Sequence, residues 1–139
     1  MDPFTDMMQA FLATTHIVSA HELVLWLQEW LTITTNANAL VCRASEVGTA
    51  ACAQAWDVLT RLRRLPDGAQ YPYFIDALQA FSCYHYHAAD TIRCTVEFPR
   101  DPGLSGLQAW VRDWLANGAQ QSLICGPAAS FEKVLTALV

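Results

Sequence analysis

Apolar residues recur every three or four positions along most of this chain, and strand-like alternation is scarce. Such spacing places apolar side chains on one face of a helix. No proline interrupts the chain between Pro3 and Pro66. The pattern therefore predicts an all-α fold of about five helices in a single domain spanning residues 1–139. The expected helices cover residues 4–13, 20–34, 44–65, 72–97 and 98–115.

The start of the second helix is marked by a capping box. In Ser19-Ala-His-Glu22, the serine and glutamate side chains can each accept a hydrogen bond from an exposed amide of the first turn. The β-branched and Asn-rich segment 32–39 should end this helix. Its expected apolar face consists of Leu23, Trp26, Leu27, Trp30 and Leu31.

The two central helices carry small and apolar residues at alternating four- and three-residue spacings, which is typical of a coiled-coil seam. The turn-forming segment 65–72 joins them as an antiparallel hairpin, a spike spanning about 44–98. One hairpin cannot bury both seams, so we expect two copies to dimerise as a four-helix bundle, with Cys52 near the twofold axis. The expected dimer interface consists of Gly48, Cys52, Ala55, Leu59, Leu62, Phe74, Leu78, Phe81, His85 and Ala88.

The C-terminal part of the chain combines an amphipathic helix with an irregular arm, over about residues 101–127. Trp110 and Trp114 lie one helical turn apart, and the arm that follows contains apolar residues that are costly to expose. We therefore expect this region to contact neighbouring dimers, with residues 128–139 forming an apolar stub. The expected contact residues are Trp110, Trp114, Gln121, Leu123, Ile124 and Pro127.

Composition narrows the class of function. Hydrophobic residues make up 53% of the chain and charged residues 15%, which favours burial of apolar surface in a partner. The net charge of −5 argues against a nucleic-acid-binding face within these residues. The longest apolar run, residues 23–27, is too short to span a bilayer, so we expect no membrane insertion.

The cysteines and histidines do not form a recognisable catalytic or metal site. Five cysteines without a CxxC pair, in a chain whose start is acidic rather than signal-like, predict reduced and buried thiols. Cys83, His85 and His87 are two residues apart on a predicted helix and point in different directions, so buried packing is favoured over zinc. We expect no enzyme activity, no cofactor and no metal. The basic cluster at 61–64 is either a solvated helix end or a contact for a phosphate or an acidic partner.

Several stretches, in order, resemble the capsid (core) protein of hepadnaviruses and of their non-enveloped fish relatives, the nackednaviruses. The order and spacing of these stretches, rather than any single motif, carry the resemblance, which covers the whole chain. Pro127 follows Trp114 by thirteen residues, similar to the step from the fifth-helix tryptophan to the proline of the family's assembly arm. The other matching stretches are Met1 to Phe4, Ser19 to Val24, Thr49 to Leu59, Ile92 to Cys94, and Phe98 to Asp101.

The resemblance implies a structural protein that forms homodimers and self-assembles into an icosahedral shell around the viral genome. It further implies a location in the virion, with assembly in the host cytoplasm or nucleus. Viral RNA or DNA would bind through a basic C-terminal tail absent here. A different class of function, a monomeric helical adaptor or matrix-like protein-binding domain, stays open. It predicts a monomer.

Two other features depart from the family. The segment 65–71 is shorter than the hairpin tip of the human virus, which implies a blunter spike. Gln121 stands seven residues after Trp114, where family members carry a buried tyrosine, so that contact must be built differently.

Overall fold

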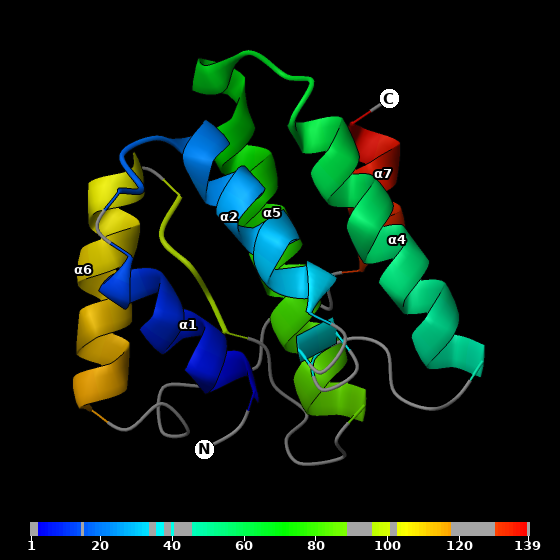
Figure 1. The fold of residues 1–139 in the computed structure, drawn as a ribbon, viewed down its shortest axis with the longest axis horizontal. Helices are drawn as coiled ribbons and strands as arrows, with labels where there is room; N and C mark the ends of the chain where they lie inside the picture. The colour runs from blue at the N-terminus through cyan, green and yellow to red at the C-terminus, as the bar shows by residue number, and fades with distance from the viewer. Residues whose placement is uncertain are drawn as a thin grey trace.

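The computed structural model describes residues 3–14, 16–33, 36–37, 40, 46–88, 96–100, 103–117 and 130–138. Within these ranges the chain is helical, without a strand, which confirms the all-α prediction (Figure 1). The described helices are α1 (Pro3–Ala13), α2 (Ala20–Thr32), α4 (Glu46–Leu62), α5 (Asp67–Ala88), α6 (Gly103–Ala116) and α7 (Phe131–Ala137).

Helix α2 begins where the capping box predicts. The Ser19 hydroxyl accepts a hydrogen bond from the Glu22 amide at 3.2 Å. The Glu22 carboxylate accepts one at 3.1 Å from the amide of Val18, the residue before the cap, rather than from the Ser19 amide that a capping box pairs with it. Leu23, Leu27 and Leu31 of the predicted face are buried, and Trp26 and Trp30 pack partly buried against the same core.

Helices α4 and α5 form the predicted antiparallel hairpin, with a shorter turn than expected. Helix α5 begins at Asp67 rather than near Pro72, so Pro72 lies inside the helix, in its second turn, where it cannot donate a backbone hydrogen bond. Gln70, fully buried, donates from Nε2 to the carbonyl oxygens of Leu62 at 2.9 Å and Leu65 at 3.2 Å. This side chain therefore caps the end of α4 and fixes the turn.

The end of α5 also differs from the prediction. The described helix stops at Ala88, and residues 96–99 are not helical, although the sequence predicts a helix through residue 97. Val96 is fully buried and Phe98 is 5% exposed, so these residues pack as an apolar corner before α6. The fifth predicted helix likewise starts at Gly103, which has a φ of 68°, rather than at residue 98.

The hairpin is covered on two sides by other helices. Helix α2 contacts both α4 and α5, and α7 also contacts both of them. In Figure 1, α2 lies in front of the hairpin, whereas α7 lies behind α4. Helices α1 and α6 pack against each other at the opposite edge from α4. The hairpin is therefore covered on two sides within this chain.

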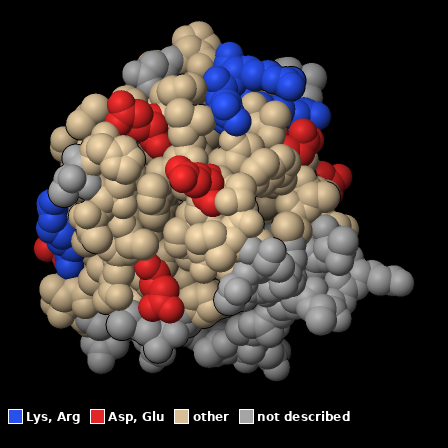
Figure 2. All heavy atoms as spheres, viewed as in Figure 1, with Lys and Arg blue, Asp and Glu red and all other residues tan. Residues whose placement is uncertain are grey.

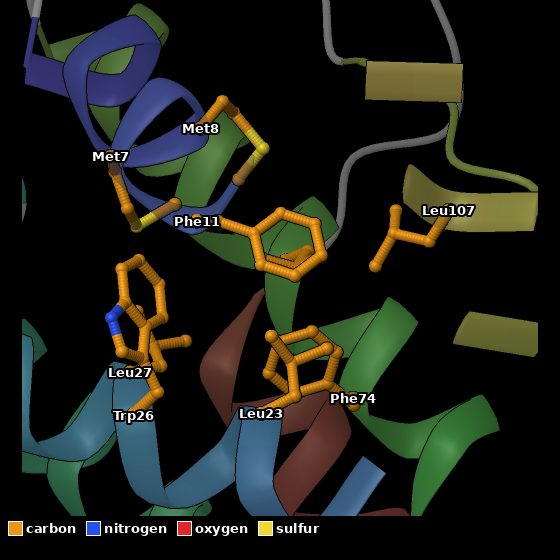
Figure 3. Close-up of a pocket in the computed structure, with 9 residues that line it drawn as sticks. Met7, Met8, Phe11, Leu23, Trp26, Leu27, Phe74 and Leu107 are labelled. Atoms are coloured by element: carbon orange, nitrogen blue, oxygen red, sulfur yellow. The ribbon is translucent and has the colours of Figure 1, made fainter. Parts of the chain in front are cut away.

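The core is continuous from α1 to the hairpin. Figure 3 shows side chains of α1, α2, α5 and α6 converging on one apolar junction. A cavity of about 10 Å³ remains there, with room for about one water molecule but no polar side chain to hold it. The lining residues are Met7, Met8, Phe11, Leu23, Trp26, Leu27, Phe74, Leu78 and Leu107. The hollow is therefore apolar and too small for an organic ligand.

Candidate assembly surface

The predicted dimer seam is buried inside a single chain. Ala55, Leu59, Leu62, Phe74, Leu78, Phe81 and His85 are each at most 3% exposed. The expectation that one hairpin leaves this seam uncovered is therefore wrong for these seven residues. Their spacing marks the face of each helix that packs into the core, because any buried helical face produces the same periodicity. Gly48 and Ala88 lie outside the set of residues whose burial the structure describes.

Helix α7 completes the burial of the hairpin. The Phe131 ring lies edge-on to Phe81, with ring centroids 4.9 Å apart and an interplanar angle of 75°. It also lies against Tyr84, at 6.4 Å. Phe131 and Val134 are each 3% exposed, which corresponds to about 1.5–3 kcal/mol of burial for each side chain. The C-terminal stub expected from the sequence is therefore a helix docked on the hairpin.

Polar contacts join the α4 end of the hairpin to α2 and to α7. Gln28 of α2, 4% exposed, donates to the Thr60 hydroxyl at 3.1 Å and accepts from the Arg63 guanidinium at 2.9 Å. On the α7 side, Arg61 donates to the carbonyl oxygen of Leu135 at 3.4 Å and pairs with Asp57 at 3.4 Å. The Leu135 carbonyl belongs to the last turn of α7, where carbonyl oxygens lack partners within the helix.

Cys52 is not the reduced thiol that the sequence predicts. It is half-buried on α4 and engaged in a disulfide bond within the chain. Its partner cysteine lies outside the described residues. A thiol already in an intrachain bond cannot also crosslink two subunits, so the expected Cys52–Cys52 bridge at a twofold axis is not compatible with this pairing. Cys83 is a free thiol, 8% exposed, as expected for a buried cysteine.

The corner at 96–100 is fastened to the hairpin. The Tyr71 hydroxyl donates to the carbonyl oxygen of Pro99 at 3.1 Å, and burial raises the pKa of Tyr71 to about 12. Arg100 forms an ion pair with Asp76 and donates to Gln79 at 3.4 Å. These contacts set the direction in which the chain leaves the hairpin and enters α6.

The two tryptophans of α6 occupy different environments. Trp114 is 2% exposed and meets Phe4 of α1 edge-on, at 6.0 Å. The expectation that Trp114 contacts another dimer is therefore corrected: it belongs to the core of its own chain. Trp110 is half-buried, stacks on Trp114 at 5.8 Å and contacts Phe98 at 5.0 Å. Of these two tryptophans, only Trp110 is partly exposed to solvent.

Four of the predicted contact residues, Gln121, Leu123, Ile124 and Pro127, lie outside the described residues.

The two other sequence candidates are the cluster around Cys83 and the basic cluster at 61–64. Within the described residues there is no cluster of three metal-ligating side chains. His85 is buried and stacked on Phe4 at 6.4 Å, as the packing interpretation predicts. Figure 2 shows one group of basic atoms near the hairpin turn and a smaller group at the opposite edge of the view. Arg61 and Arg63 near the turn make the contacts already described, whereas Arg64 is exposed on the turn.

Exposed apolar side chains are few in the described part of the chain. The large ones are Val18 at 74%, Ile33 at 54% and Trp56 at 43% exposed. The high apolar content of the sequence is thus used mostly inside the subunit. Trp56 was not among the predicted contact residues, although its position on α4 outside the four-three seam could have indicated its exposure.

The chain was compared with family models, curated proteins and solved structures. No family model, curated protein or solved structure matches the chain. None of the described helices is long and apolar enough to cross a membrane.

Proposed function

We propose that this chain is a viral capsid subunit that dimerises through the α4–α5 hairpin and self-assembles into an icosahedral shell enclosing the viral genome. The observation that carries the proposal is the hairpin of 17- and 22-residue helices with α6 directed away from it by a fastened corner. At 1.5 Å per residue these helices are roughly 25 and 33 Å long, which is long enough for an extended interface between two hairpins.

The order of the helices supports the same proposal. Two N-terminal helices, a long hairpin, a bend at Phe98–Arg100 and a tryptophan-bearing helix follow one another in the order that the capsid resemblance implies. A subunit of this kind acts through contacts rather than catalysis, since shells are built from many weak and symmetric interfaces. Genome binding would need a basic segment beyond these residues.

Contacts between dimers would use the edge of α6 together with the arm. Trp110 supports this role because its ring is held by Trp114 and Phe98 and still reaches the surface. A rigid, partly exposed aromatic ring is the type of side chain that anchors interfaces, since little conformational entropy is lost on binding.

A monomeric helical adaptor is the second candidate, and one observation favours it. The hairpin seam is already covered within one chain, so the apolar core needs no second copy. The adaptor predicts a monomer at every concentration and a surface centred on exposed side chains such as Trp56.

Light scattering on the full chain separates the two functions. The capsid proposal predicts dimers whose population grows with concentration, and closed particles of uniform size in negative-stain micrographs when salt is raised. Salt screens the repulsion between acidic subunits, so assembly should rise with ionic strength. A monomer without particles under all conditions would favour the adaptor.

A further inference from the structure

We infer that α7 is an autoinhibitory helix, which covers the hairpin face used for dimerisation and must leave it before two hairpins can pair. This inference rests on the proposed function, since it concerns the dimer that the capsid subunit would form. In this inference α7 controls when that dimer forms.

The position of α7 carries the inference. The hairpin has one side covered by α2, which is tied to α4 by Gln28 and belongs to the main core. The other side carries Phe81 and Tyr84, and there the covering element is α7. A second hairpin can reach α4 and α5 together only from that side, because α2 occupies the first.

The contacts of α7 are those of a displaceable element. It has seven residues, and helices shorter than about 12 residues are marginal without tertiary support. Its side chains Phe131 and Val134 are buried, whereas Glu132, Lys133 and Thr136 are exposed. The polar bond that joins it to α4, from Arg61 to Leu135, is 3.4 Å long.

A second hairpin would replace this cover with a larger one. Phe81 and Tyr84, which now contact one phenylalanine ring, would instead face two long helices. The ring of Phe131 would be exposed by the exchange, so the equilibrium depends on the difference between the two covers. Weakening α7 should therefore favour the dimer.

The test compares full-length variants by sedimentation velocity over a range of concentrations. Phe131→Asp should release α7 and raise the dimer association constant at least about tenfold, equivalent to about 1.4 kcal/mol. Thr136→Asp adds the same charge on the exposed side of the same helix and should change the constant by less than about twofold, since it breaks no buried contact. Circular dichroism verifies that both variants remain folded.

Hydrogen exchange of the α7 amides provides the second readout. They should be protected in the wild-type monomer and exchange rapidly in the dimer. If Phe131→Asp loses its helical signal, Arg61→Gln takes its place, because it removes the bond to Leu135 and leaves the apolar contacts intact.

Each outcome decides one question. The inference is overturned if a folded Phe131→Asp variant keeps the wild-type association constant. It is also overturned if the α7 amides stay protected in the wild-type dimer, although that result would leave the proposed dimer intact. Variants that dimerise more strongly but never form shells would support the inference while contradicting the capsid function.

Discussion

Phe131 of α7 lies edge-on to Phe81 of α5, with 4.9 Å between the ring centroids. These residues are fifty positions apart in the chain, yet their contact decides how the hairpin is interpreted. The sequence predicts that Phe81 contacts a second copy of the chain, whereas in the structure it contacts Phe131 of its own chain. Any dimer formed through this face has to give up this aromatic contact.

Placing a charge in the hairpin seam should unfold the chain rather than only separate dimers. Leu59 is fully buried, so Leu59→Asp places a carboxylate in an apolar core and should lower the free energy of unfolding by roughly 3–5 kcal/mol. Urea denaturation followed by circular dichroism measures the change.

Trp56→Asp is the matched control on the same helix, because Trp56 is 43% exposed. It should retain the wild-type fold. Equal loss of stability in the two variants would show that the exposed and buried faces of α4 have been misassigned.

The two tryptophans of α6 should respond differently to truncation. Trp114→Ala removes a fully packed ring and should destabilise the chain by about 3–5 kcal/mol. Trp110→Ala should cost clearly less stability, since part of the ring is already in water, and should instead reduce the yield of particles in micrographs. A Trp110→Ala chain that forms shells as well as wild type would remove Trp110 from the contacts between dimers.

Alkaline pH should loosen the corner that leads into α6. The pKa of Tyr71 is raised by burial from 10.0 to about 12, so the folded state favours the neutral phenol. Its contribution to stability is complete below pH 10 and is lost as the pH rises towards 12 and beyond. In thermal melts over this range, Tyr71→Phe should show a smaller alkaline decline than wild type. Identical declines would show that other groups dominate.

The disulfide of Cys52 should stabilise the subunit without linking subunits. Removing a native disulfide typically costs about 2–5 kcal/mol in a small domain, so Cys52→Ser should melt at a lower temperature than wild type under non-reducing conditions. Cys83→Ser should have a smaller effect, since Cys83 forms no disulfide. A covalent dimer on a non-reducing gel that disappears in Cys52→Ser would contradict the intrachain pairing.

The helices were predictable because their periodicity and caps are local properties of the sequence. The capping box at Ser19 is an example, since both of its hydrogen bonds lie within five residues. The element that covers a buried face is often distant in the sequence, so the spacing within one helix does not reveal it. The four-three spacing therefore predicted which face of α4 around Leu59 is buried, but not which helices cover it.

Helix α7 has a local signal in the sequence. Ser130 caps its start by accepting a hydrogen bond from the Lys133 amide at 3.2 Å. Phe131, Val134, Leu135 and Leu138 follow at helical spacing. The split between Trp110 and Trp114, by contrast, depends on where α1 packs, which no spacing within α6 reveals.

The most direct test of the capsid function is light scattering followed by negative-stain microscopy on wild type and Phe131→Asp side by side, at increasing salt and protein concentration. We predict dimers in both, a larger dimer fraction in the variant, and closed particles of uniform diameter at high salt. Chains that remain folded monomers in both proteins, without particles under any of these conditions, would contradict the capsid function.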